Sequence, residues 1–129
     1  MQISKQKVNK ILENQLQQMW YQMVADIKNP REAREIFSNL LSETELTTVI
    51  KRLATGYWLT KKRSYEVIRD NLKVSSASIA SIQKDLKNPG WQIAIKKILA
   101  EEWATKWEEK IKSLLKVRRY EAKRNSKRS

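Results

Sequence analysis

The sequence predicts an all-helical protein, and three observations support this fold class. The chain of 129 residues has only two glycines and two prolines, which leaves few breaks for the turns of a sheet. The alternation of apolar and polar residues that is typical of half-buried strands is absent. Apolar residues instead recur at steps of three and four, as on one face of a helix. We therefore expect one helical domain over residues 1–115.

Helix signals divide the first 40 residues into two segments. Apolar residues form one helical face from about Lys5 to Ile27, which predicts a first helix over this range. Asn29 and Pro30 then indicate an end and a restart. Asparagine is a good helix cap, and proline suits a first position where its missing N–H costs no hydrogen bond. A short second helix is expected to follow.

The clearest helix start lies at residues 42–45. Ser42 and Glu45 have the spacing of a capping box, and Leu41 and Leu46 stand where a hydrophobic staple would close the first turn. The third helix is expected to end near the basic run at 61–63, because positive charge is favoured at the carboxyl end of a helix.

The middle of the chain has two helical faces that are out of phase. Ile68 and Leu72 are spaced as on one face, and Ile79 and Ile82 as on another, with the break between these pairs. Two short helices joined by a tight turn, each burying one face in the same core, produce this pattern. It predicts a helix-turn-helix motif over about residues 64–87.

The second helix of such a motif can enter the major groove of duplex DNA, so its outward residues are candidates for contacting bases. Small and polar side chains let the helix approach base edges closely. The base-edge candidates are Ser76, Ala77, Ser78, Ala80 and Ser81. Polar and basic residues around the motif are candidates for phosphate contacts. They are Arg63, Ser64, Arg69, Lys73, Lys84 and Lys87. Ser64 and Ser75 are also expected to cap the two helices.

The chain beyond the motif begins with a group of helix breakers, Lys87-Asn88-Pro89-Gly90. A helical stripe of apolar residues then continues over one long segment to Leu114. Trp91, Trp103 and Trp107 belong to this stripe. We expect them in the core or in a dimer interface and not stacked on bases.

The last segment, residues 116–129, differs in composition from the rest. It carries seven Lys and Arg residues against the single acidic residue Glu121, a net charge of +6. Such a segment is expected to be a disordered tail. It would act either as a solvated end of the chain or as an arm that contacts phosphates.

Composition favours a polyanionic partner and excludes several functional classes. There are 27 Lys and Arg residues against 14 Asp and Glu, a formal net charge of +13, which favours nucleic acid first and an anionic membrane surface second. The chain has no cysteine or histidine, which excludes disulfides, thiol chemistry, zinc sites of the Cys/His type and histidine base catalysis. Neither a glycine-rich phosphate loop nor a metal-ligand cluster is recognisable, so we expect no enzyme, cofactor or metal.

The paired glutamates and the lack of a long apolar run also bear on function. The carboxylates Glu101-Glu102 and Glu108-Glu109 are expected to form helix ion pairs with Lys106 and Lys112 in place of an acid–base site. No apolar run approaches the roughly 20 residues of a membrane span, and no signal peptide is evident. A cytoplasmic location is therefore expected.

Four segments carry a family resemblance: Leu-Leu-Ser-Glu-Thr-Glu-Leu at 40–46, Lys-Arg-Leu at 51–53, Arg-Ser-Tyr-Glu-Val-Ile at 63–68 and Val-Ser-Ser-Ala-Ser-Ile-Ala at 74–80. They resemble the Trp repressor superfamily, most closely its Trp-repressor-related branch, and the likeness covers roughly Pro30 to Ile98. It implies an intertwined all-α homodimer that binds a two-fold DNA operator.

The resemblance also bears on a small-molecule effector. In the family, two arginines and nearby hydroxyl groups hold tryptophan. Arg52 matches the first arginine and Ser42 a hydroxyl position, but Ser81 stands where the carboxylate-binding arginine would be. Asp85 falls where the family has a small hydroxyl residue. Because the lost contact is charge-assisted, we do not expect tryptophan to act as a corepressor, and any other effector is left open.

These observations lead to two functional hypotheses. The first is a homodimeric regulator of transcription, similar to a repressor, that binds specific duplex DNA sequences. The alternative is a nucleic-acid-binding or nucleoprotein assembly module that does not read sequence. They differ in discrimination, since a regulator should prefer its site over random duplex by roughly 10³-fold or more.

Overall fold

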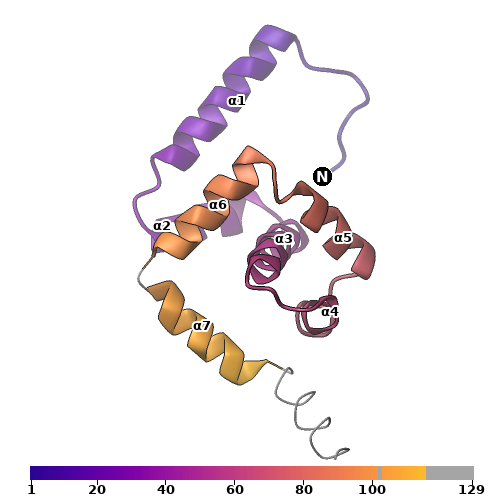
Figure 1. Ribbon diagram of the computed structural model, residues 1–129. Helices are drawn as coiled ribbons and strands as arrows, with labels where there is room; N and C mark the ends of the chain where they lie inside the picture. Colours follow the sequence, from indigo (N-terminus) through magenta and orange to yellow (C-terminus); the bar gives the residue numbers. More distant parts are fainter. Residues whose placement is uncertain (102, 116–129) are drawn as a thin grey trace, which may run out of the picture. The chain divides into compact units, whose positions relative to one another are not determined.

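The computed structural model describes residues 1–101 and 103–115, in which every regular element is a helix (Figure 1). The helices are α1 (Lys10–Ala25), α2 (Pro30–Leu40), α3 (Glu43–Thr60), α4 (Tyr65–Leu72), α5 (Ser76–Asp85), α6 (Pro89–Ala100) and α7 (Trp103–Leu114). The predicted all-α fold class is confirmed. The predicted basic tail, residues 116–129, lies outside the described residues.

The chain forms two compact units, and the boundary between them falls within α3. The first unit, Met1–Leu46, contains α1, α2 and the first turn of α3. The second unit begins at Thr47 and contains the rest of α3 and the helices that follow.

Helix α1 is shorter at both ends than the range predicted from Lys5 to Ile27. It begins at Lys10 because the side chain of Asn9 accepts hydrogen bonds from the backbone N–H groups of Ile11, at 2.9 Å, and Leu12. A capping asparagine cannot also lie inside the helix that it caps, so the apolar periodicity before it is not helical. At the other end, α1 stops at Ala25.

The predicted caps of α2 and α3 are confirmed. The side chain of Asn29 accepts from the N–H of Glu32 at 2.8 Å, with Pro30 at the start of α2. The Ser42 hydroxyl accepts from the Glu45 N–H at 3.1 Å, and the Glu45 carboxylate accepts from the Ser42 N–H at 2.8 Å. This hydrogen bond from the Ser42 backbone holds the pKa of Glu45 below its ordinary value.

The core of the second unit is built around the two short helices α4 and α5. Ile68 on α4 and Ile79 on α5 are fully buried, and Ile82 and Ile95 are buried beside them in the same cluster. Helices α4 and α5 contact each other because each buries its own apolar face in the shared core. The predicted pair of helices is therefore present, separated by a short turn (Figure 1).

A close approach between α3 and α6 explains one of the two glycines. A Cβ added to Gly56 would lie 2.4 Å from the ring of Trp91, so only glycine leaves room for this ring without a shift. Trp91 is partly buried against the core, as predicted for the apolar stripe, whereas Trp107 is 57% exposed. Trp103 begins α7, and its side chain lies outside the described part of the chain.

The single long segment predicted after residue 90 is instead two helices. Helix α6 ends at Ala100, and the next residue, Glu101, has an extended backbone with φ −73° and ψ 130°. The backbone therefore leaves the helical region before α7 starts at Trp103. This break lets α7 contact α6.

The turn between α4 and α5 contains a lysine in a left-handed conformation. Lys73 has φ 57° and ψ 52°, and its N–H donates to the carbonyl oxygen of Arg69 at 2.9 Å. Glycine is favoured at such a helix end, because a Cβ is crowded in this region. The family resemblance indicates glycine at this position. In this chain the same turn places the Cβ of Lys73 in the left-handed region, which costs conformational energy.

We predict that Lys73→Gly stabilises the fold by about 0.5–1 kcal/mol. Relief of the left-handed strain is worth about 1–2 kcal/mol, and the greater flexibility of glycine in the unfolded chain offsets part of this gain. Urea denaturation followed by circular dichroism measures the change. Ala80→Gly, inside α5, is the control and should destabilise by about 1 kcal/mol. A destabilising effect of Lys73→Gly would contradict the strain argument.

Candidate nucleic-acid interface

Two serine caps define the start of each helix in the α4–α5 pair. The Ser64 hydroxyl accepts from the Val67 N–H at 3.2 Å, and the Ser75 hydroxyl accepts from the Ser78 N–H at 3.1 Å. Both caps agree with the sequence prediction. Because each cap satisfies an N–H of the first turn, it fixes the residue at which the helix begins.

Helix α5 has one buried face and one exposed face. Ile79 and Ile82 are buried, and the hydroxyl of Tyr65 on α4 donates to the Gln83 side-chain oxygen at 2.8 Å, which links the two helices at their edge. All five base-edge candidates are exposed, as expected from the helical period: Ser76, Ala77, Ser78, Ala80 and Ser81. Their small side chains would allow the backbone of α5 to come close to a groove floor.

Four of the six phosphate candidates are basic residues with exposed side chains. They are Arg69, Lys73, Lys84 and Lys87. Arg69 forms an ion pair with Asp70 at 3.4 Å, but its side chain remains 47% exposed, so the contact leaves it accessible. The Ser64 residue is also exposed, although its hydroxyl already serves as the cap of α4. The structure therefore surrounds α5 with cationic groups on α4, on the turn and at its own carboxyl end.

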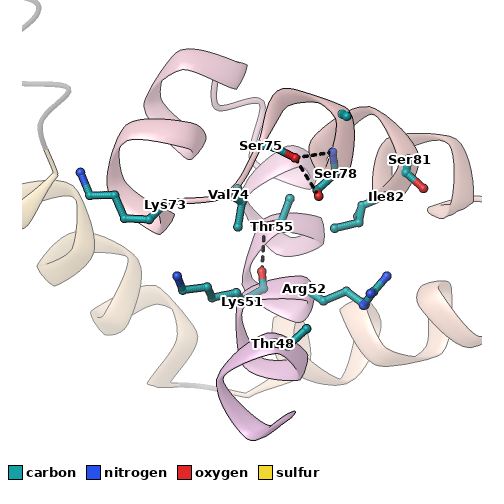
Figure 2. A pocket seen from close by; sticks show the side chains of 11 residues that line it. Thr48, Lys51, Arg52, Thr55, Lys73, Val74, Ser75, Ser78, Ser81 and Ile82 are labelled. Carbon is teal, nitrogen blue, oxygen red and sulfur yellow. Dashed lines mark hydrogen bonds between the residues drawn. The ribbon is translucent and has the colours of Figure 1, made fainter. Parts of the chain in front are cut away.

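A cavity of about 600 Å³ lies between α3 and the amino end of α5 (Figure 2). It is lined by Thr48, Lys51, Arg52 and Thr55 of α3, by Lys73, Val74 and Ser75 of the turn, and by Ala77, Ser78, Ser81 and Ile82 of α5. Thr55 is fully buried, and its hydroxyl donates to the Lys51 carbonyl oxygen at 2.7 Å. Polar and basic side chains of α3 and α5 therefore face the same cavity.

Residues 14–100, more than half of the chain, match the family model described as Trp repressor protein. The chain belongs to the Trp repressor family. No curated protein and no solved structure matches it. The family is one of regulators that bind DNA and are not enzymes, which indicates a function of this kind for the chain.

The match extends further toward the amino terminus than the resemblance in the sequence. The resemblance identified there began near Pro30, whereas the match to the Trp repressor family starts at residue 14 and so includes most of α1. It ends at residue 100, the last residue of α6. Helix α7 therefore follows the region that defines the family.

The two residues expected in a Trp-repressor-like effector pocket, Arg52 and Ser42, belong to different compact units. Arg52 lines the cavity, together with Ser81. Ser42 belongs to the first compact unit, where its hydroxyl is part of the capping box of α3. Asp85, noted as a departure from the family pattern, is partly buried and is not among the residues that line the cavity.

The remaining phosphate candidate, Arg63, lies in a polar cluster that sequence reasoning missed. Its guanidinium pairs with the carboxylate of Glu108 on α7, and their side chains are only 9% and 12% exposed. The guanidinium also lies over the ring of Trp58, 4.9 Å from the centroid. Arg63 is thus directed into the protein, and we omit it from the proposed phosphate contacts.

Tyr57 completes this cluster, which we call the α7 clamp: Tyr57, Trp58, Arg63 and Glu108. The Tyr57 hydroxyl donates to Glu108 at 3.1 Å, and burial, together with this neighbouring carboxylate, raises the pKa of Tyr57. Glu108 was expected to pair with a lysine on its own helix, which is wrong, because the partner is 45 residues away in sequence. Periodicity predicts neighbours along one helix and carries no signal for such a distant pair.

In the residues that the structure describes, no helix is long and apolar enough to span a membrane. Within the same part of the chain, no group of three or more acidic residues is placed to hold a metal ion.

We predict that Glu108→Ala destabilises the protein by about 3 kcal/mol. The substitution leaves the largely buried Arg63 without its counter-charge, and breaking a buried ion pair costs about 3–5 kcal/mol when both charges are fully enclosed. Chemical denaturation gives the value. Glu109→Ala, at the exposed neighbouring position, is the matched control and should change stability by less than about 0.5 kcal/mol. Equal effects of the two substitutions would contradict a stabilising role for the α7 clamp.

Proposed function

We propose that the protein is a homodimeric regulator of transcription that binds specific sequences in duplex DNA through α5. The observation that carries this proposal is the exposed face of small residues on α5, opposite the buried Ile79 and Ile82. Residues Ser76, Ala77 and Ala80 lie on this face near the amino end of the helix. In the helix-turn-helix proteins, the amino-terminal part of the second helix contacts base edges.

Phosphate contacts are assigned to Arg69, Lys73, Lys84 and Lys87. Arg69 lies on α4, the helix that crosses the DNA backbone in this class of motif. Contacts of this kind position the protein and increase affinity for all sequences alike. The formal net charge of +13 supports association with a polyanion. The proposed location is the cytoplasm, and no enzymatic activity is proposed.

One observation favours the alternative, an assembly module that does not read sequence. The first half of α5 presents serine and alanine, and none of the long side chains that form paired hydrogen bonds with a base. Sequence discrimination by α5 would therefore depend on methyl contacts, serine hydroxyls and DNA shape.

The homodimer is proposed because large apolar surfaces remain exposed on one chain. Helix α1 has 16 residues and buries none of them, and its Ile11 and Met19 are 72% and 65% exposed. In α3, Val49 and Ile50 are 55% and 56% exposed. An isolated helix of this length is marginal in water, so α1 needs a surface to cover its apolar face. A second copy of the chain, as in the family resemblance, would supply that surface.

We predict that Arg69→Ala and Ala80→Arg change DNA binding in different ways. Arg69→Ala should weaken binding to all duplexes about equally and lower the salt slope by about one, because it removes one phosphate contact. Ala80→Arg should alter which sequences are preferred, or abolish specific binding while retaining non-specific binding.

The measurement uses a duplex selected from a random library, and a scrambled version of it, at several salt concentrations. Arg34→Ala, an exposed site on α2, is the control for loss of one positive charge. If Ala80→Arg leaves the preference unchanged, α5 is not the reading element and the assembly-module alternative is the better account.

We predict a homodimer at micromolar concentration, with twice the 15.3 kDa mass of the chain. Leu16→Glu should shift the equilibrium toward monomer, because it places a charge on the apolar face of α1. Gln17→Glu, which adds the same charge at the neighbouring exposed position, should leave the dimer intact. Sedimentation equilibrium distinguishes these results, and a species of 15.3 kDa alone for the unmodified protein would refute the proposal.

A further inference from the structure

The cavity between α3 and α5 contains an excess of positive charge. Of the described residues that line it, three, Lys51, Arg52 and Lys73, are basic and none is acidic. The ion pairs found in the described part of the chain, Arg63 with Glu108 and Arg69 with Asp70, involve none of these three cations. Like charges repel when no counter-charge separates them, so this arrangement favours a ligand with more than one negative charge.

The rest of the lining supplies hydrogen-bond donors. The hydroxyls of Ser78 and Ser81 on α5 line the cavity, whereas those of Thr55 and Ser75 already donate to the Lys51 carbonyl oxygen and to Ser78 Oγ. The cavity also meets the amino end of α5, a helix of ten residues, where first-turn N–H groups and the helix dipole favour an anion. The three cations, the amino end of α5 and the hydroxyls of Ser78 and Ser81 together suit oxygen atoms of an anion better than an amine.

The basic side chains approach from two sides of the cavity. In Figure 2, Arg52 extends on the side of Ser81, whereas Lys51 extends on the opposite side of Thr55, toward the side of Lys73. Val74 and Ile82 add apolar surface to the lining. A volume of about 600 Å³ is larger than one phosphate group needs, so the site can hold a phosphate together with the body that carries it.

We propose that this cavity binds the phosphate group of an anionic ligand, carried either by a small phosphorylated molecule or by a nucleic-acid strand. Arg52 provides a planar guanidinium that can bind two phosphate oxygens, and Lys51 and Lys73 balance the remaining charge. A zwitterionic amino acid suits the site less well, because the described lining residues include no carboxylate to pair with its ammonium group. The proposal concerns the free protein and holds whether or not α5 reads sequence.

The test titrates inorganic phosphate and phenyl phosphate into the full chain by calorimetry, with chloride adjusted to hold the ionic strength constant. One saturable site per chain is expected. Lys51→Gln and Arg52→Gln should each weaken binding about tenfold, the effect of losing one charge-assisted hydrogen bond. Lys96→Gln, an exposed lysine of α6 outside the cavity, should bind like the unmodified protein.

Three results would overturn the proposal. They are the absence of saturable binding, equal weakening by Lys96→Gln and by the cavity variants, and tighter binding of L-tryptophan than of phenyl phosphate. Amide chemical shifts of Ser76, Ala77 and Ser78 in a labelled sample provide an independent readout of occupancy. They should move with phosphate in the unmodified protein and need about tenfold more phosphate to move in Arg52→Gln, whose otherwise unchanged spectrum shows that it is folded.

A second arm identifies the source of the phosphate group. If a small molecule is the ligand, saturating phenyl phosphate should leave DNA affinity unchanged or increase it. If the DNA strand supplies the group, phenyl phosphate should compete with duplex, and Arg52→Gln should lower the salt slope by about one. Either result supports the site. Failure of DNA binding altogether would reject the proposed function while leaving the phosphate titration of the free protein decisive.

Discussion

The burial of Ile68 and Ile79 in one core cluster is the constraint on which the rest of the candidate interface depends. Both side chains are fully excluded from solvent, one on α4 and one on α5. A short helix has few other ways to fix its rotation, because eight or ten residues form only two or three turns. Once Ile79 is buried, the helical period turns Ser76, Ala77 and Ala80 outward. The exposed face of α5 is therefore a consequence of core packing.

The α7 clamp adds a constraint from outside the region that matches the family. Glu108 lies on α7, beyond residue 100, and pairs with Arg63 immediately before the cap of α4. Arg63 also retains one buried nitrogen, Nη1, that has no hydrogen-bond partner among the residues that the structure describes. A buried cation that is incompletely satisfied depends strongly on its single carboxylate. The position of α7 is thus coupled to the start of the helix-turn-helix motif, and one basic residue is withdrawn from the surface.

Charge and apolar surface are arranged differently in the two compact units. In the second unit, basic residues lie around α5 and line the cavity beside it. The apolar faces of α4 and α5 form part of the buried core of this unit. In the first unit, the apolar face of α1 remains exposed. Exposed apolar faces of this extent are typical of surfaces that associate. We therefore assign association between two copies of the chain to α1 and anion binding to the region near α5.

The sequence by itself determined the helical fold class, the caps at Asn29, Ser42, Ser64 and Ser75, and the outward face of α5. These features depend on contacts within four residues or on the helical period, and both are readable from local spacing. It misplaced the start of α1 and joined α6 to α7, because periodicity continues through residues that leave the helix. Only the tertiary structure decided where Arg63 and Glu108 point, since their contact joins positions 45 residues apart. The cavity likewise requires α3, the turn and α5 to be brought together in space, which no local pattern encodes.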